Sequence, residues 1–391
     1  MKSTSSSSRH PHPSRLQELR HFLKKISPAA KTLWAFLLIF FIINLITPSR
    51  KFSAQENRAL AQRPPSLLSQ AFGNDFSTYY SDQFFGRDAL VRLNFTAQRM
   101  IGQRQFSDVY VGRDGYLIAE PKKPDSGKLK AALQAITDFS SSHPDLKTNM
   151  ILVPDAASVI PDKLPANVPA GEEEEQIAGI YKSLPSAVAA TDAGKALREA
   201  SGQVYYRTDH HWTSNGAYAV FKSAAASLGI DTIVDYDVRN VSSTFQGTLA
   251  SRSGDAHSYD SIQIYTPRKE VLYSVHYPDL KQKTRSMFMP DKLKEKDQYT
   301  VFLGGNHAVV EIATTAQTGK SLLILKDSYA NSFVQFLVPY YDTIIMVDPR
   351  YYYENVDSVI TNYKTSDLLY IYSADTLFED TSLADTLNAA K

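Results

Sequence analysis

Hydrophobic and polar positions along this chain follow two different spacings that alternate. Short runs that are apolar at nearly every position predict buried strands, and several are followed by the spacing of an amphipathic helix. The predicted strands are residues 148–153, 203–206, 321–325, 342–347 and 367–372, and the predicted helices are residues 172–184, 214–228 and 329–337. This order is typical of a mostly parallel sheet with helices on both faces. The pattern therefore predicts an α/β fold.

Three segments depart from this alternation. Val109–Val111 and Tyr116–Ile118 flank a Gly-Arg-Asp-Gly sequence, in which Asp-Gly is typical of a β-hairpin turn. Residues 53–103 have a largely helical pattern. Residues 236–303 are polar and rich in strand-forming runs, such as 299–302. We interpret 236–303 as a β-rich insertion near the functional site and not as a separate domain.

The N-terminal region differs in composition from the rest. Residues 1–31 are rich in Ser, Pro and His, carry seven basic residues against one acid, and are expected to be disordered. Leu33–Thr47 is almost entirely apolar but short for a spanning helix; extended back through Pro28–Ala30 and on to Pro48, it reaches about the length that a bilayer needs. A cleaved signal peptide is the alternative, but no small-x-small cleavage site follows the run.

The basic flank orients this expected anchor in the membrane. Positive charge before an apolar segment favours a cytoplasmic N-terminus and an exported C-terminal region. We therefore expect a cytoplasmic tail at 1–31, one transmembrane helix at 32–49 and an extracytoplasmic domain at 50–391, held at the cell membrane.

Composition narrows the chemistry that is available to the exported region. The chain has no cysteine, which excludes disulfides, thiol nucleophiles and cysteine-ligated metals. A net charge of +1 gives no indication of a nucleic-acid partner.

The segment Tyr205–Tyr218 concentrates reactive side chains. Within it, Asp209 and His211 stand two positions apart, so on extended backbone their side chains point to the same face. This is the geometry of a carboxylate that orients an imidazole. Ser328 follows the strand 321–325 at the carboxyl edge of the sheet, where ligands of α/β proteins bind.

These three residues together predict a nucleophilic serine with a histidine base. The Ser328 N–H near a helix N-terminus would favour a developing oxyanion. His211 would accept the serine proton, and Asp209 would orient the imidazole. The alternative is that Ser328 serves only as a helix N-cap.

Other residues near this pattern are candidates for binding. Gly305 lets the backbone approach a ligand closely, and the following Asn306 could donate to an oxyanion or simply belong to a turn. Trp212 could stack on a sugar, although packing beside a buried histidine is the favoured interpretation. Tyr329 is adjacent to Ser328. Arg350 would lie at the carboxyl edge of the sheet, where it binds an anionic sugar or pairs with Asp348.

The combination of motifs resembles the DHHW family, named after Asp209-His210-His211-Trp212. The resemblance covers roughly residues 50–375 and is specific as a set of motifs. The other matching segments are Glu56–Arg58, Phe84–Asp88, Tyr205–Thr208, Gly247–Leu249, Gly304–His307, Lys326–Asn331 and Asp348–Tyr352.

The DHHW family is similar in turn to the SGNH-hydrolase-like domains of proteins that O-acetylate alginate and related bacterial polysaccharides. The resemblance implies an SGNH-hydrolase-like three-layer sandwich, with Ser328 as nucleophile, His211 as base and Asp209 as its orienting acid. His210 has no counterpart in that pattern. The implied activity is transfer of an acetyl group to a polysaccharide. Because acetyl-CoA is cytoplasmic, a multi-pass membrane acyltransferase is the implied partner.

Other functions remain open on the sequence alone, although a phosphate or nucleotide enzyme is disfavoured because the chain has no Gly-rich phosphate loop. The same site could pass the acetyl group to water as an acetylesterase, or the fold could serve as a non-catalytic polysaccharide-binding or assembly subunit. A metal site from Asp209, His210, His211 and His307 is disfavoured, because adjacent histidines on a strand point to opposite faces. We expect no metal and no other cofactor.

Overall fold

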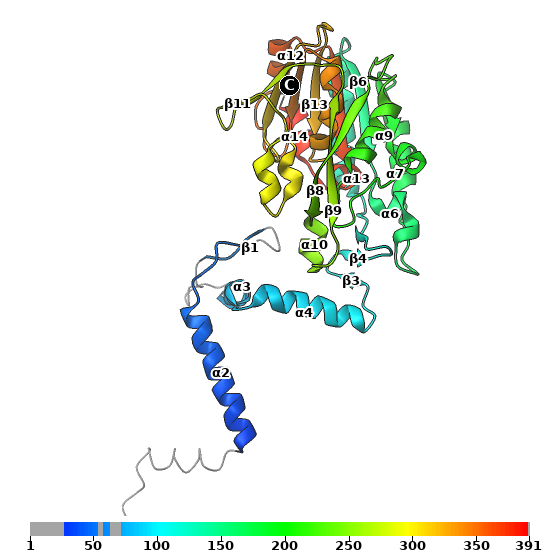
Figure 1. Cartoon of the computed structure of the whole chain (residues 1–391). Coiled ribbons are helices and arrows are strands. Elements are labelled where there is room, and N and C mark those ends of the chain that lie inside the picture. The colour runs from blue at the N-terminus through cyan, green and yellow to red at the C-terminus, as the bar shows by residue number, and fades with distance from the viewer. Residues whose placement is uncertain (1–26, 54–57, 63–71, 390–391) are drawn as a thin grey trace, which may run out of the picture. The chain divides into compact units, whose positions relative to one another are not determined.

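The computed structural model describes residues 27–53, 58–62 and 72–389 (Figure 1). Contacts divide the chain into two compact units, residues 1–53 with 58–90, and residues 54–57 with 91–391. The tail expected to be disordered falls mostly in residues 1–26, outside the described residues, and so do Glu56 and Asn57 of the family motif.

The first unit contains the apolar helix expected from the sequence. Helix α2 (Pro28–Ile46) begins at Ser27, whose hydroxyl accepts from the Ala30 N–H, and no residue of it is buried. Its length and composition suffice to cross a membrane. The unit also holds β1 (Phe52–Ser53), β2 (Arg58–Ala59), α3 (Phe72–Gln83) and the start of α4 (Arg87–Met100). Asp82 of α3 is buried and pairs with Arg58.

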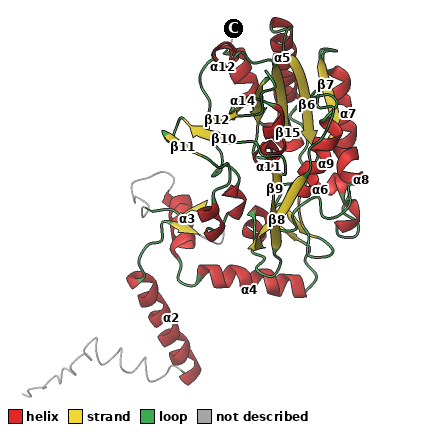
Figure 2. Ribbon diagram, turned by 45° about the horizontal axis from the view of Figure 1, so that its top comes forward, coloured by secondary structure: helices red, strands yellow, loops and turns green. Residues whose placement is uncertain are grey.

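The second unit is built on an 8-stranded sheet in the order β11-β10-β12-β14-β13-β15-β6-β7 (Figure 2). The strands are β6 (Lys147–Val153), β7 (Val188–Asp192), β10 (Tyr273–Tyr277), β11 (Gln282–Thr284), β12 (Val309–Thr314), β13 (Ser321–Lys326), β14 (Thr343–Val347) and β15 (Asp367–Ser373). From β14 to β7 all neighbours are parallel, whereas β12, β10 and β11 extend the sheet by antiparallel pairing. The predicted mostly parallel sheet is confirmed.

Helices cover both faces of this sheet, which gives the predicted three layers (Figure 2). Leu322 and Ile324 of β13 face one apolar core with α6 (Ala156–Val159), α8 (Ala193–Glu199), α9 (Ser214–Ala224) and α11 (Ala330–Phe333). Leu323 and Leu325 face the other core with α5 (Ser126–Ser142), α7 (Glu173–Ser183), α12 (Val356–Tyr363), α13 (Ala374–Glu379) and α14 (Ser382–Asn388). A strand that is buried on both sides therefore reads as a continuous apolar run.

Smaller elements lie against this framework. The hairpin predicted from Asp-Gly is confirmed as β4 (Val109–Val111) and β5 (Leu117–Ala119), and β3 (Gln105–Phe106) pairs with β4. Within residues 236–303, β8 (Tyr236–Phe245) and β9 (Asp260–Pro267) form an antiparallel ribbon, and β10 and β11 join the main sheet. The remaining elements are α10 (Thr248–Ser253) and the 3-10 helices η1 (Pro161–Lys163), η2 (Pro290–Lys294), η3 (Gln298–Val301), η4 (Val334–Phe336) and η5 (Val338–Tyr340).

Three sequence-based predictions of secondary structure were wrong. Residues 203–206 form no strand, because Tyr205 pairs only with Trp212 through an isolated bridge. Residues 299–302 are largely the 3-10 helix η3 and not a strand. The helix expected at 329–337 is one α-helical turn, α11, followed by the 3-10 turn η4. In each case, packing of a short apolar run decides its conformation more than its propensity does.

The continuous core on β13 gives a test of the fold. We expect Leu323→Ala to lower the free energy of unfolding by about 2–5 kcal/mol, because Leu323 is fully buried between helices and neighbouring strands. Urea unfolding followed by the fluorescence of the buried Trp212 measures this loss. The matched control Leu280→Ala removes a leucine that is 55% exposed and should change stability by about 0.5 kcal/mol or less. Equal losses in both variants would contradict the assignment of the core.

Candidate active site

The segment between Tyr205 and Trp212 forms a closed loop. The Thr213 N–H donates to the Val204 carbonyl, and the Tyr206 N–H donates to the His211 carbonyl. Asp260, 3% exposed, fastens the loop from β9. One Asp260 oxygen accepts from the Arg207 N–H at 2.9 Å, and the other accepts from the Thr208 N–H at 2.8 Å and the Thr208 hydroxyl at 2.7 Å. Asp209 and His211 thus lie at the tip of a held loop and not on the extended backbone assumed for them after the predicted strand 203–206.

A chain of hydrogen bonds joins this loop to β13. His211 Nε2 lies 2.7 Å from Ser328 Oγ, and His211 Nδ1 lies 2.5 Å from Asp209 Oδ1. Asp209 and His211 are buried, whereas Ser328 is partly exposed. The three residues that the sequence selected are therefore adjacent and in the order serine, imidazole, carboxylate.

The carboxylate of Asp209 is fully engaged by the surrounding chain. Its Oδ1 also accepts from the His211 N–H, and its Oδ2 accepts from the Thr248 N–H at 2.8 Å and the Thr248 hydroxyl at 3.1 Å. Burial acts to raise the pKa of Asp209, but the nearby His211 and His210 and these hydrogen bonds outweigh it. The net effect holds the pKa of Asp209 well below its usual range, so this side chain stays ionised.

Gly247 makes room for that carboxylate. A Cβ added at Gly247 would lie 2.6 Å from Asp209 Cγ and closer still to Oδ2 and Cβ. The backbone there has φ −87°, so the need for glycine comes from close approach and not from a left-handed conformation. Gly247 and Thr248 were visible in the sequence as a matching motif, but only the structure shows why they are needed.

His210 is placed beside the triad without joining it. Its Nδ1 lies 2.7 Å from Thr248 Oγ1, and its ring centroid is 3.9 Å from that of His211. Burial and repulsion from His211 lower the pKa of His210 to about 4, against the attraction of Asp209. His210 is therefore neutral near pH 7.

The turn that carries Ser328 is fixed on both sides. Asp327 accepts from the Tyr329 N–H at 3.0 Å and from the Ser373 N–H at 2.8 Å. Tyr299 stacks on His211 with 3.9 Å between centroids, and its hydroxyl donates to the Ser328 carbonyl at 3.0 Å. Within the described residues, no hydrogen bond uses the Ser328 N–H. Because α11 is only one turn long, its dipole adds less to this donor than the longer predicted helix would.

Trp212 and Tyr329 lock the two parts of the site together. Trp212 is fully buried, and its indole N–H donates to the Tyr329 carbonyl and the Ser332 hydroxyl. This burial agrees with packing, the favoured interpretation, and leaves no face of Trp212 for a sugar. Tyr329 is also buried, and its hydroxyl donates to the His210 carbonyl at 2.5 Å.

Asn306 and Gly305 are held by hydrogen bonds from Lys326 and Asn331. Asn306 is exposed, and its Oδ1 accepts from Lys326 Nζ at 3.3 Å and Asn331 Nδ2 at 3.0 Å. Asn331 also donates to the Gly305 carbonyl at 3.4 Å. Lys326 is buried against Asp348. Neither Asn306 nor Gly305 lines the cleft described next.

A cleft of about 360 Å³ opens at Ser328. Ser328, His210 and Tyr329 line it, together with Arg350, which pairs through two hydrogen bonds with the buried Asp348. Its other lining residues are Ala119, Glu120, Lys122, Asp155, Thr248, Arg252, Asp327, Ser373, Asp375 and Thr376. Arg350 lies at the carboxyl edge of the sheet, as predicted, and it pairs with Asp348, which was one of its two expected roles.

Asp155 and Asp375, which line this cleft, belong to a cluster of carboxyl groups with the buried Glu173. Asp155, Glu173 and Asp375 each offer an oxygen within 4.8 Å of the others. Burial is the main cause that raises the pKa of Glu173 to about 7 and that of Asp375 to about 6, and it raises the pKa of Asp155 as well. The cluster therefore carries less negative charge than three free carboxylates would.

Three of the four residues considered for a metal site lie close together in the structure. Asp209, His210 and His211 offer ligand atoms within 4.8 Å of one another. However, both oxygens of Asp209 and both ring nitrogens of His211 already have hydrogen-bond partners. His307 instead lies 2.9 Å from Asp279 and 3.1 Å from the Leu303 carbonyl.

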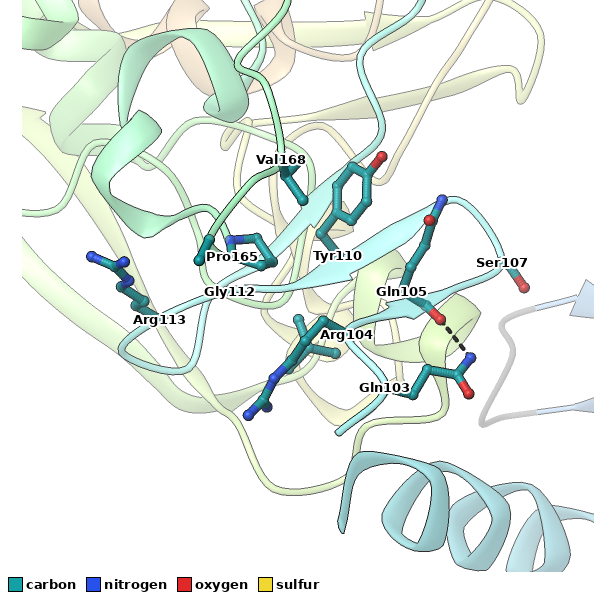
Figure 3. A pocket seen from close by; sticks show the side chains of 11 residues that line it. Gln103, Arg104, Gln105, Ser107, Tyr110, Gly112, Arg113, Pro165 and Val168 are labelled. Atoms are coloured by element: carbon teal, nitrogen blue, oxygen red, sulfur yellow. Dashed lines mark hydrogen bonds between the residues drawn. The ribbon is translucent and has the colours of Figure 1, made fainter. Parts of the chain in front are cut away.

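A second hollow, of about 1040 Å³, lies along β3 and β4 (Figure 3). Arg104, Gln105 and Tyr110 line it on one side, with Pro165 and Val168 on the other, and Gln103 donates to the Gln105 carbonyl at 2.7 Å. Its lining contains no member of the Ser328–His211–Asp209 chain. The larger of these two hollows is therefore not the one that contains Ser328.

Three residues that build the site escaped the sequence interpretation. Asp260 and Tyr299 lie in the β-rich insertion, where no motif distinguishes them from the other acids and the 23 tyrosines of the chain. Asp327 was seen only as part of a matching motif. Their roles depend on contacts between segments that are distant in sequence.

Comparison with known proteins supports the resemblance inferred from the motifs. The family described as "SGNH hydrolase-like domain, acetyltransferase AlgX" matches residues 109–306, half of the chain. No curated protein matches the chain.

Solved structures share this fold at low sequence identity. A DHHW family protein from Eubacterium siraeum is 20% identical, with a TM-score of 0.57 over 71% of this chain and 97% of that one. PatB1 from Bacillus cereus, solved with a sulfonyl adduct, is 18% identical, with a TM-score of 0.59 over 69% of this chain and 96% of that one. The predicted SGNH-like α/β fold is confirmed by these structures, and the expected relation to AlgX is confirmed by the family match.

The close approach at Gly247 generates a prediction. We expect Gly247→Ala to lower kcat for ester hydrolysis by about 10²-fold, since the new methyl group must displace Asp209 and with it the imidazole. Steady-state kinetics with p-nitrophenyl acetate measure the change. The control Gly179→Ala adds a methyl group to α7 where no atom lies within 4 Å, and it should retain wild-type kcat. Wild-type kcat in a folded Gly247→Ala variant would refute the role of the Asp209 contact.

The lowered pKa of His210 predicts a pH dependence of stability. Between pH 6.5 and about 4 the unfolded chain binds a proton at His210 that the folded chain does not, so this residue makes stability fall as pH falls. His210→Gln removes that loss. Melting temperature measured from pH 7 to pH 4 should fall less steeply in His210→Gln than in the wild type. Parallel curves for the two proteins would show that His210 does not titrate as inferred.

Proposed function

This chain belongs to the family of SGNH hydrolase-like domains of the acetyltransferase AlgX, and on that premise we propose that it is a membrane-anchored, extracytoplasmic serine O-acetyltransferase acting on a polysaccharide. One observation carries the proposal. Ser328, His211 and Asp209 form a continuous chain of hydrogen bonds at 2.7 and 2.5 Å, and the serine end opens into a cleft.

In the proposed mechanism, Ser328 Oγ attacks the carbonyl carbon of an acetyl ester. His211 Nε2 takes the serine proton, and Asp209 holds the imidazole in the tautomer that can accept it. Collapse of the tetrahedral intermediate expels the donor oxygen, which receives that proton, and leaves an acetyl group on Ser328. A sugar hydroxyl then gives its proton to His211 as its oxygen attacks the acetyl carbon, and the free serine is regenerated.

Two donors are proposed for the oxyanion. The Ser328 N–H has no partner within the described residues, so it is available to a developing negative charge. The second is Asn306 Nδ2. Lys326 and Asn331 both donate to Asn306 Oδ1, so this orientation leaves the amide N–H₂ to donate elsewhere. Asn306 would have to turn toward the cleft when an acyl group is bound, with Gly305 as the flexible link.

The cleft supplies the proposed acceptor site. Its volume of about 360 Å³ lies within the range of about 300–1,000 Å³ typical of small-molecule sites. Its polar lining suits sugar hydroxyls, and Arg350 suits an anionic sugar while it remains held by Asp348. Fully buried Trp212 supports the site without lining the cleft, whereas Tyr329 forms part of the cleft wall.

The acetyl source and the anchor complete the proposal. Helix α2 is long and apolar enough to hold the chain in a membrane. An extracytoplasmic enzyme has no access to cytoplasmic acetyl-CoA, so we propose a multi-pass membrane acyltransferase partner that delivers acetyl groups to Ser328. Transfer to water by the same residues would make the protein an acetylesterase, and the acceptor decides between the two activities.

Loss of turnover tests the proposed nucleophile and base. We expect Ser328→Ala and His211→Ala each to lower kcat for p-nitrophenyl acetate by about 10³-fold or more, because one lacks the attacking oxygen and the other the proton acceptor. Ser261→Ala, which removes an exposed hydroxyl from β9, is the matched control and should keep full activity.

Covalent labelling provides the second readout. The PatB1 structure carries a sulfonyl adduct, and we expect a sulfonyl fluoride to add to Ser328 in this chain, as located by peptide mass spectrometry. Labelling should vanish in Ser328→Ala and persist in Ser261→Ala. Turnover that survives Ser328→Ala in full would overturn the proposed mechanism.

A further inference from the structure

Helix α4 (Arg87–Met100, labelled in Figure 2) buries the side chain of Phe95. Phe95 is 1% exposed and packs on Phe106 with 4.5 Å between ring centroids. Phe95 belongs to a small core with residues of β4, β5 and α10. Val91 approaches Gly254 so closely that a Cβ there would lie 2.9 Å from Val91 Cγ1. These contacts fix which side of α4 faces the protein.

The opposite side of α4 is also apolar, and it is exposed. Leu93 is 65% exposed, Met100 is 82% exposed and Ile101, just past the helix, is 84% exposed. The exposed Ala97 lies four residues after Leu93, and Met100 and Ile101 lie three and four residues after Ala97, so the four positions form one stripe along the helix. At about 100° per residue the stripe points away from Val91 and Phe95. It is therefore not part of the core that anchors α4.

The charged residues within residues 89–107, which include this stripe, are all basic. From Ala89 to Ser107 the sequence contains no acidic residue, whereas it contains Arg92, Arg99 and Arg104. An exposed apolar stripe bordered by arginines is the pattern of a helix that lies in the interface of an anionic bilayer, with its apolar side chains among the lipids and its arginines at the headgroups. Solvent exposure of three large apolar side chains in one stripe is otherwise unfavourable.

The same chain carries a helix that can enter a bilayer. Helix α2 precedes α4, and only α3 and two short strands of the described residues come between them. A tether of this kind raises the effective concentration of the following segment at the lipid surface, so even a short stripe can bind there.

We propose that the exposed stripe of α4 (Leu93, Ala97, Met100 and Ile101) binds the surface of an anionic lipid bilayer. Attachment through α4 is a second membrane contact, separate from the spanning helix, and it restricts the rotation of the second unit about its tether. The proposal is independent of the acetyl-transfer chemistry, because none of these residues lines the cleft at Ser328.

The absence of native cysteine makes a direct test available, since one introduced cysteine takes a spin label at one place. The full chain is reconstituted in vesicles of phosphatidylcholine with phosphatidylglycerol. Labels are placed at Leu93→Cys and Met100→Cys, and at the exposed control Glu175→Cys on α7. We expect the first two labels to collide more with oxygen than with a water-soluble nickel complex, and the control to show the reverse.

Two matched variants separate lipid binding from misfolding. With the label at Ile101→Cys, the changes Leu93→Ser and Met100→Ser should return the label to water while ester turnover and melting temperature stay at wild-type values. Arg99→Gln with Arg104→Gln, or vesicles of phosphatidylcholine alone, should shift the label several-fold toward the nickel complex, because the anionic attraction is lost.

Two outcomes would overturn the proposal. Labels at Leu93 and Met100 that reach the nickel complex as freely as the control would show that the stripe stays in water. Labels that become protected only when a membrane acyltransferase is added would assign the stripe to a protein partner. Labels that are equally protected from the nickel complex with and without anionic lipid would refute the proposed contribution of the arginines to lipid binding.

Discussion

The buried carboxylate of Asp209 is the constraint around which the site is organised. A buried charge is costly unless donors surround it, and Asp209 receives donors from His211 on one oxygen and from Thr248 on the other. Those donors belong to two segments that are distant in sequence. The requirement to satisfy one carboxylate therefore brings the 205–212 loop against the N-terminal turn of α10 and selects glycine at position 247.

Uncharged side chains connect the loop that carries Asp209 to the turn that carries Ser328. Trp212 bonds to the turn after Ser328, and Tyr299 stacks on His211 while it holds the Ser328 carbonyl. Asp260 then closes the loop from the β8–β9 ribbon. The β-rich insertion thus holds the site, since it supplies Asp260 and Tyr299 but none of Ser328, His211 and Asp209.

The sequence predicted the layers of the fold and the identity of the Ser328, His211 and Asp209 group, for reasons that can be stated. Continuous apolar runs such as Leu322–Leu325 admit few interpretations, and residues that follow such strands collect at one edge of a parallel sheet. The local conformation of Tyr205–Trp212 was not predictable, because Asp260, 48 positions or more from the loop, decides it. Nor could the sequence show that Trp212 is sealed from solvent or that Asn306 stands outside the cleft, since both depend on tertiary packing.

Asp209 and His211 belong to one loop, whereas Ser328 lies 117 positions away on another element. The spacing of Asp209 and His211 is therefore set within one loop, whereas the distance from His211 to Ser328 depends on how that loop packs against the turn after β13. Trp212 contributes to this packing, because its indole N–H donates to the Tyr329 carbonyl and the Ser332 hydroxyl. The indole thus helps to hold His211 beside Ser328, although its own hydrogen bonds go to other residues.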